Sequence, residues 1–294
     1  MVNIIDNRIP EQCQGLSAAV ELRGNSVADE FASVGHIDGG VGAFQFHFDG
    51  FYRDTDDFEI PGSALTADKL AELDPEERAE SPRGTLENSA LENEGGTLGG
   101  SFVGDWGYAG FAYKRYDSTY GIPADLEEEE EEEGGEEGEE EEGGISIDLE
   151  QERYEIKSAL YSPVSGIDEI SFKFVTNDYQ HVEFEGDEIG TTFNIDGTEI
   201  RTAIKLEPIG RFSSTLGVQY EDTELEAIGA EAFIPPATTE ALGVFAVSEY
   251  DLDPVKLSAG LRWQDEEVSL DQGLVIDGFD ERDFTLFTAS AGAI

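Results

Sequence analysis

The chain has 294 residues and a formal net charge of −50 at pH 7, because 67 aspartate and glutamate residues outnumber 17 lysine and arginine residues. A surface of this charge repels phosphate groups, which excludes nucleic acid as a partner, and it concentrates cations. Similar acidity is also typical of surface proteins from saline habitats. Cys13 is the single cysteine, so an intrachain disulfide and a thiolate metal cluster are both excluded.

The amino-terminal residues 1–6 read Met-Val-Asn-Ile-Ile-Asp. A secretory signal peptide would instead begin with a basic stretch and continue with an apolar one. No apolar run in the chain has the length of a membrane-spanning helix. We therefore expect that the chain lacks a signal peptide. An outer-membrane barrel protein needs such a signal for export, so we expect the chain to be a fragment if it belongs to a barrel of this kind.

Residues 41–52 predict the first clear strand, because apolar and polar side chains alternate there with a period of two. Phe44, Phe46 and Phe48 would lie on one face. The other face would carry Gln45, His47 and Asp49, which we expect to line a wet lumen as ordinary polar side chains. Nothing near His36 in the sequence indicates a ligand role for it.

The same alternation recurs at residues 145–150, 170–174 and 255–264. The links between such segments are alternately short and long. Tight turns are predicted at residues 39–42, 162–166, 206–210 and 251–254, and long segments at 56–89, 120–144, 221–239 and 267–282. One end of the sheet would then carry short turns and the other end long loops.

This asymmetry predicts the fold class: all-β, an antiparallel transmembrane β-barrel with short periplasmic turns and long extracellular loops. We count about twelve strands, which makes an open partial barrel. Aromatic residues such as Trp106, Tyr108 and Trp263 would mark the membrane interface. A soluble β-sandwich also alternates apolar and polar residues, but its loops need not alternate in length.

An acidic run lies within the long segment that precedes Ile145, and we expect residues 124–144 to form a disordered external loop. A tract of this kind is either a solvated spacer or a site that captures cations. Carboxylates alone suit hard cations such as calcium, magnesium or manganese. The candidate residues for cation capture are Glu127, Glu128, Glu129, Glu130, Glu131, Glu132, Glu133, Glu136, Glu137, Glu139, Glu140, Glu141 and Glu142.

A second candidate metal site is formed by His181, Glu183 and Glu185. At spacings of two, these side chains project to the same side of a strand end, so an imidazole and two carboxylates could hold one cation. An equally acceptable interpretation is that His181 simply lines the lumen near the rim. We find no phosphate-binding loop, nucleophile elbow or poised carboxylate pair, and therefore expect no enzymatic activity and no resident cofactor.

Several segments, in this order, resemble TonB-dependent outer-membrane receptors, and the zinc-uptake branch most closely. The likeness covers almost the whole chain. The resemblance rests on residues 2–10 (VNIIDNRIP), 38–58 (DGGVGAFQFHFDGFYRDTDDF), 60–62 (IPG), 113–123 (YKRYDSTYGIP), 178–186 (DYQHVEFEG), 190–193 (GTTF) and 231–236 (EAFIPP).

The resemblance implies that residues 1–10 end a plug domain and that residues 11–294 form the amino-terminal half of a barrel. It also implies a location in the outer membrane of a Gram-negative bacterium, contact with outer-membrane lipid, and energy supplied by a TonB–ExbB–ExbD complex through the plug. The ligand would be a metal ion or a metal complex, with zinc first and an iron–siderophore or haem next. The alternatives are a soluble, acidic, cation-binding β-sandwich and a passive porin-like channel.

Overall fold

The computed structural model describes residues 6–294 apart from 76–77, 79–80, 82, 124–143, 230–231, 233 and 271–279. Among the described residues, no helix has the length and apolar character needed to cross a membrane. The elements are β1 (Ser17–Asn25), β2 (Glu30–Val41), β3 (Phe44–Thr55), β4 (Phe58–Ser63), α1 (Ala67–Glu72), β5 (Arg83–Leu86), β6 (Leu91–Gly104), β7 (Gly107–Ile122), β8 (Ile145–Val164), β9 (Ile167–Glu185), β10 (Glu188–Leu206), β11 (Phe212–Gly229), β12 (Ala237–Asp251), β13 (Lys256–Leu270) and β14 (Glu281–Ala293).

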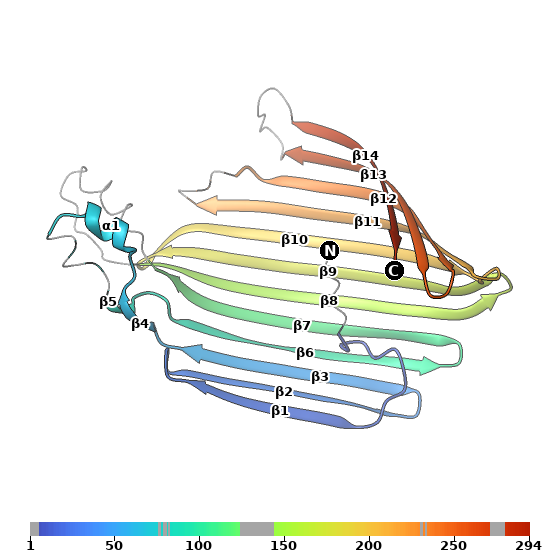
Figure 1. Ribbon diagram of the computed structural model, residues 1–294, viewed down its shortest axis with the longest axis horizontal. Coiled ribbons are helices and arrows are strands. Elements are labelled where there is room, and N and C mark those ends of the chain that lie inside the picture. Colours follow the sequence, from blue (N-terminus) through green and yellow to red (C-terminus); the bar gives the residue numbers. More distant parts are fainter. Residues whose placement is uncertain are drawn as a thin grey trace.

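Twelve of these strands form one antiparallel sheet in which each strand pairs with the next one in the chain, except that β3 pairs directly with β6. The small β4–β5 hairpin and α1 lie in the loop between β3 and β6, beyond one end of the sheet (Figure 1). Within the described residues, β1 and β14 each pair on one side, so the sheet is open. The prediction of an open partial barrel of about twelve antiparallel strands is confirmed.

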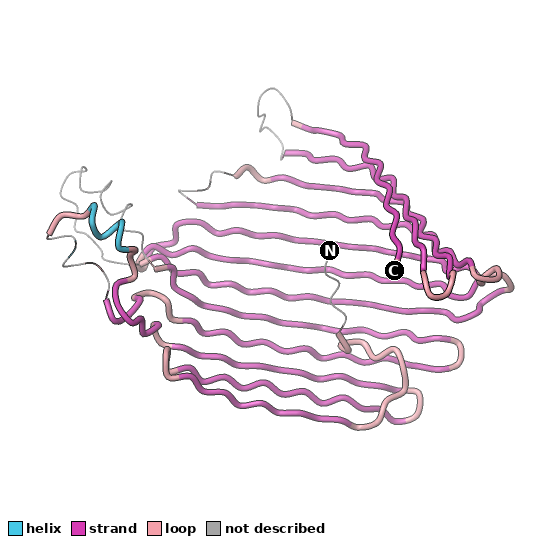
Figure 2. Tube along the Cα trace, in the orientation of Figure 1, coloured by secondary structure: helices cyan, strands magenta, loops and turns pink. Residues whose placement is uncertain are grey.

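The sheet is a curved wall (Figure 1), with its middle strands farther from the viewer than β1 and β14. We call its concave side the inward face and its convex side the outward face. The tube in Figure 2 shows how little of the sheet is interrupted by loops. The sheet is a single layer, so each strand presents alternate residues to the two faces.

The outward face is apolar and uncovered. Phe44, Phe48, Leu98 and Phe102 are 43%, 54%, 59% and 61% exposed, and the strand register places Phe44 opposite Phe102 and Phe48 opposite Leu98. On the inward face Gln45 is only 1% exposed. Large apolar side chains outside and polar side chains inside reverse the order of a water-soluble domain and fit a wall that meets hydrocarbon.

The two ends of the sheet differ as the sequence predicts. At the turn end, short links join β2 to β3, β6 to β7, β8 to β9, β10 to β11 and β12 to β13. At the loop end, residues 56–90 and 123–144 form long links. Two links at the loop end are short: residues 26–29 join β1 to β2, and residues 186–187 join β9 to β10. In the second of these links Gly186 has a positive φ of 57°, which permits the tight turn.

Three predicted boundaries are wrong. Residues 221–229 and 237–239 of the predicted loop 221–239 are strand, because β11 continues to Gly229 and β12 begins at Ala237. The predicted loop 267–282 begins too early, because β13 continues to Leu270. The many acidic residues of these strand ends are typical of a loop. Strands that extend beyond the apolar band can nevertheless carry charge on both faces while their backbones stay paired.

The turn predicted at residues 39–42 begins later, at Gly42, whose φ is 61°. Gly39 and Gly40 belong to β2. Neither position has room for a side chain, because a Cβ atom at Gly39 would meet the Phe46 ring and a Cβ atom at Gly40 would meet the Gln45 side chain.

Residues 6–15 lie across the inward face and reach from β2 to β8. Asn7 donates to Asp38 at 2.6 Å, Ser101 donates to the carbonyl of Pro10, and Lys157 forms an ion pair with Glu11. Ile9 is 4% exposed and is part of a small buried apolar cluster, whose other members are Val103, Tyr108, Ala112 and Ala159. The segment that precedes β1 is therefore anchored to the inner wall.

The same segment carries an ion pair between Asp6 and Arg8, which lie before the first strand. Partial burial acts to raise the pKa of Asp6, but the hydrogen bonds and the charge of Arg8 outweigh burial and hold this pKa below its ordinary value. The Arg8 guanidinium also lies 3.6 Å from Glu155 of β8. Charge pairing thus supports the anchoring that Ile9 provides by burial.

Gly99 of β6 allows this close approach, because a Cβ atom there would overlap the carbonyl group of Arg8. We expect Gly99→Ala to push residues 6–15 away from the wall and to destabilise the fold by about 1–3 kcal/mol. Cleavage by trypsin after Arg8 should accelerate, and urea unfolding should shift. Gly197→Ala in β10, where a Cβ atom meets nothing within 4 Å, is the matched control and should behave like the wild type.

Candidate functional site

The inward face is the surface on which the strand register gathers polar and charged side chains. One line of directly paired residues, which we call the transverse row, crosses the sheet from β3 to β13. It consists of Gln45, Ser101, Gly110, Lys157, Lys173, Arg201, Gln219, Gly243 and Gln264. This row is the reference line for the site.

His47 lies beside the start of the transverse row, in a buried network on β2 and β3. Its ring nitrogens lie 2.7 Å from Asp38 and 2.6 Å from Asp49, and Asp38 also accepts the hydrogen bond from Asn7. Because both neighbours are carboxylates, both ring nitrogens must donate, which makes the imidazole a cation between two anions. The network holds the anchored segment to the wall.

Gln45, His47 and Asp49 all belong to the inward side, as the alternation in β3 predicts. Gln45 accepts a hydrogen bond from the backbone of Gln14 at 3.0 Å, so it contacts the anchored segment as well. The absence of a ligand role for His36 stays a prediction. Its ring lies 3.8 Å from Asp38, which is two residues further along the same strand β2.

His181, Glu183 and Glu185 lie near the loop end of β9, on one side of the strand. The His181 ring is 3.9 Å from Glu183, accepts from or donates to Tyr179 at 3.0 Å, and stacks on Phe193 with ring centroids 4.5 Å apart. Their ligand atoms do not all lie within 4.8 Å of one another. The aromatic neighbours orient the imidazole, and the metal site stays a prediction.

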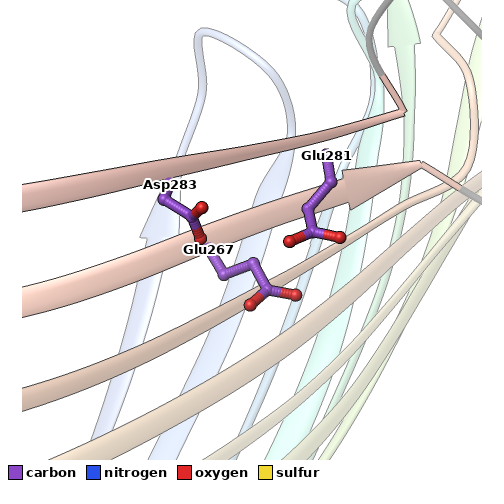
Figure 3. Close-up of side chains that lie close together, drawn as sticks. All are labelled: Glu267, Glu281 and Asp283. Atoms are coloured by element: carbon purple, nitrogen blue, oxygen red, sulfur yellow. The ribbon is translucent and has the colours of Figure 1, made fainter.

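A group of three carboxylates, Glu267 of β13 with Glu281 and Asp283 of β14, lies at the loop end on the outward face (Figure 3). Their oxygens lie within 4.8 Å of one another. Figure 3 shows the three side chains directed to the same side. Exposed acidic groups are common in a chain with this net charge, so proximity alone does not define a cation site. The predicted cation-capture residues 127–142 lie outside the described residues.

The middle of the transverse row is cationic, and the sequence analysis does not single out these residues. Lys157, Lys173 and Arg201 are directly opposite one another on β8, β9 and β10. Arg262 of β13 reaches back to Gln219 at 2.9 Å. The alternation in residues 256–264 shows that Arg262 lies on the polar side of its strand. It does not show that Arg262 lies near Arg201, because that depends on how the strands from β10 to β13 are paired.

A single-layer, curved antiparallel sheet with an apolar outward face and a polar inward face is the fold of the wall of an outer-membrane β-barrel. No family model matches the sequence. Among solved structures, the chain is similar to the copper transporter OprC, with a TM-score of 0.70 and 14% identity, over 97% of this chain and 44% of that one.

It is also similar to the FrpB iron transporter from Neisseria meningitidis (F3-3 variant), with a TM-score of 0.70 and 11% identity, over 95% of this chain and 44% of that one. The alcaligin outer-membrane receptor FauA from Bordetella pertussis matches with a TM-score of 0.65 and 12% identity, over 96% of this chain and 41% of that one. The chain therefore spans less than half the length of these proteins. At such identities the likeness establishes the fold.

Proposed function

We propose that the chain is part of the barrel of a TonB-dependent outer-membrane receptor that takes up a metal ion or a metal complex. The observation that carries this proposal is the wall itself, with Phe and Leu rows uncovered outside and a charged, hydrogen-bonded row inside. Structural neighbours that transport copper and iron support the ligand class. Among the described residues no second layer covers the apolar rows, so a β-sandwich does not account for them.

The energy source in this proposal is the TonB–ExbB–ExbD complex, which would act through a plug domain that precedes the barrel. The anchored segment 6–15 supports such an arrangement, because it enters β1 from the inward face. The barrel wall binds and guides the ligand, and no bond chemistry is assigned to it. The test is ligand accumulation by cells, which should stop when the inner-membrane proton gradient is dissipated.

Zinc is the first candidate for the ligand, and an iron–siderophore or haem is the next. His181 with Glu183 and Glu185 is the proposed zinc site on the described residues. We expect His181→Ala to weaken Zn²⁺ binding by about tenfold or more, since a lost ligand costs at least as much as a lost supporting contact. Competition titration of the purified protein in detergent measures this affinity.

The matched control for that titration is Gln180→Ala, because Gln180 is the neighbour of His181 in β9 and faces the other side of the sheet. Equal Zn²⁺ affinity in both variants would remove His181 from the zinc site. Competition among Zn²⁺, Mn²⁺ and iron chelates for the same protein would then decide the order of the ligands.

A further inference from the structure

A recessed apolar strip runs along β12 on the outward face, and we call it the outward trough. Its cavity volume is about 490 Å³. The side chains that line it include Leu216, Val218, Val244, Ala246, Leu261 and Trp263, and none of these six is charged. Val244 and Leu261 are 50% and 53% exposed. The trough is therefore open to the medium that surrounds the wall.

The strand register produces this recess. Ala246 of β12 lies directly between Leu216 of β11 and Leu261 of β13, so one short side chain is flanked by two long ones. Val244 is the preceding outward residue of β12, and it lies opposite the large ring of Trp263. Strand β12 thus forms a floor between two higher rows of side chains.

The two ends of the trough differ in polarity. Toward the turn end, Ser248 of β12 lies opposite Ala259, and its hydroxyl bonds that of Ser214 at 2.8 Å. Because the two hydroxyls bond each other, their contact with an apolar group costs less free energy. Toward the loop end, Glu240 of β12 lies directly opposite Glu267. An apolar occupant can therefore extend from the trough only toward the turn end.

The width of the trough selects the kind of occupant. Strand β12 separates β11 from β13, so these two strands lie two spacings apart, which is roughly 10 Å. The side chains of Leu216 and Leu261 narrow this space further. An α-helix with its side chains is about 10–12 Å wide and cannot enter it. A single extended hydrocarbon chain is narrow enough to reach the floor.

The length of the trough matches one leaflet of a membrane. Tyr250 is exposed at the turn-end rim of β12, where an amphipathic ring marks the level of lipid headgroups. From Tyr250 to Val244 the strand advances by roughly 20 Å. With the strand tilt of about 40° that is usual in such barrels, this advance covers roughly 15 Å of depth, which is half of a hydrocarbon core.

We propose that the outward trough binds one acyl chain of a membrane lipid from the leaflet at the turn end, with the lipid headgroup at the level of Tyr250. This site goes beyond the proposed receptor function and does not depend on the ligand that is taken up. A chain in the trough contacts a floor and two flanks, whereas a chain on the flat wall contacts one surface. Dispersion contacts are small individually and large in sum, so lipid occupies the trough in preference to the rest of the outward face.

The test uses the fluorescence of Trp263, which lies in the trough. The chain has two tryptophans, so Trp106→Phe leaves Trp263 as the single emitter. The whole chain in detergent is titrated with phosphatidylcholine that carries bromine atoms at mid-chain, because bromine quenches tryptophan on contact. The lipid competes with detergent for the apolar surface, and the ratio of lipid to detergent at half-quenching reports its preference for the site.

The reference is a variant with one tryptophan on the flat wall, made by Leu98→Trp together with Trp106→Phe and Trp263→Phe. Leu98 is exposed on the outward face of β6, outside the trough. We expect Trp263 to reach half-quenching at a ratio of lipid to detergent about threefold lower than the reference. This comparison needs no change within the trough.

A second comparison fills the trough. Ala246→Phe places a ring on its floor and should raise the ratio at half-quenching to that of the reference. The matched control is Ala109→Phe, because Ala109 is exposed on the outward face opposite Phe102 and lies outside the trough. This control should keep the preference of the wild type. Thermal unfolding of each variant verifies that it is folded.

Three results would overturn the proposal. Equal ratios for Trp263 and the reference would show that lipid meets the trough no more favourably than the flat wall. A higher ratio for Trp263 would show that a protein segment or a second copy of the chain covers the trough. A preference that persists in folded Ala246→Phe would place the bound lipid elsewhere. Ligand uptake does not enter this experiment, so each of these results leaves the proposed receptor function to its own test.

Discussion

Phe172→Arg is expected to destabilise the membrane-inserted protein by about 2–4 kcal/mol, because it places a charge at mid-depth on the outward face. Phe172 belongs to the apolar phase of β9, and its cross-strand neighbours on β8 and β10 are Ser158 and Thr202. Arginine there would be surrounded by hydrocarbon and by side chains that carry no negative charge. Urea-dependent folding into lipid vesicles measures the loss.

Ser171→Arg is the matched control for this variant. Ser171 is the adjacent residue of β9 and faces inward, where its partners are Ala159 and Ala203. A charge at this position meets water in the lumen, so we expect a change below about 1 kcal/mol. Equal destabilisation by the two substitutions would show that both faces of β9 are in the same environment.

His47→Ala is expected to produce the largest loss from a single deletion, about 3–5 kcal/mol, because it leaves two carboxylates without their shared cation. His47 is 8% exposed, and its ring bonds both Asp38 and Asp49. The substitution should also free the anchored segment, since Asp38 then repels its acidic neighbours and loses its fixed position against Asn7. Urea unfolding and the rate of trypsin cleavage after Arg8 report the two effects.

His36→Ala distinguishes this network from a general effect of removing histidine. The His36 side chain is 44% exposed and lies 3.8 Å from Asp38, so its deletion should cost less than about 1 kcal/mol. A loss in His47→Ala no larger than that in His36→Ala would show that the two hydrogen bonds of His47 do not secure the wall.

The sequence predicts the strands well where one face is apolar. The alternation of Phe44, Phe46 and Phe48 with Gln45 and His47 is a local signal, and the structure places these rows on opposite faces. The number of strands and the difference between the two ends follow from the same local signal together with the lengths of the links. The TonB-dependent family and the zinc ligand go beyond this signal and stay proposals.

The boundaries failed where both faces of a strand are polar. Residues such as Glu221, Asp222 and Glu224 carry charge throughout, so no period of two marks them as strand, yet their backbones pair with β10 and β12. The small hairpin of β4 and β5 with α1 was missed for a related reason. Short elements within a long loop have too few residues for a periodic pattern.

The site was harder to predict because it depends on register. Arg201 and Arg262 are separated by 61 positions in the sequence and meet the same glutamine, Gln219, only when β10 to β13 are correctly paired. The same holds for His36 and Asp38 against Asp49 and His47. Grouping candidate ligands by their spacing in the sequence, as for His181 and Glu183, finds neighbours along one strand. It does not find neighbours on adjacent strands of the sheet.

The central claim is that the apolar rows of this sheet meet lipid while the opposite rows meet water. The most direct measurement is a spin-label scan along residues 168–177 of β9 after Cys13, the single cysteine, is replaced by serine. The account predicts that accessibility to oxygen and to a water-soluble nickel complex alternates with a period of two, with the oxygen maxima at Ile170, Phe172 and Phe174. Labels at these three positions that neither reagent reaches would place the rows inside a protein core and contradict the account.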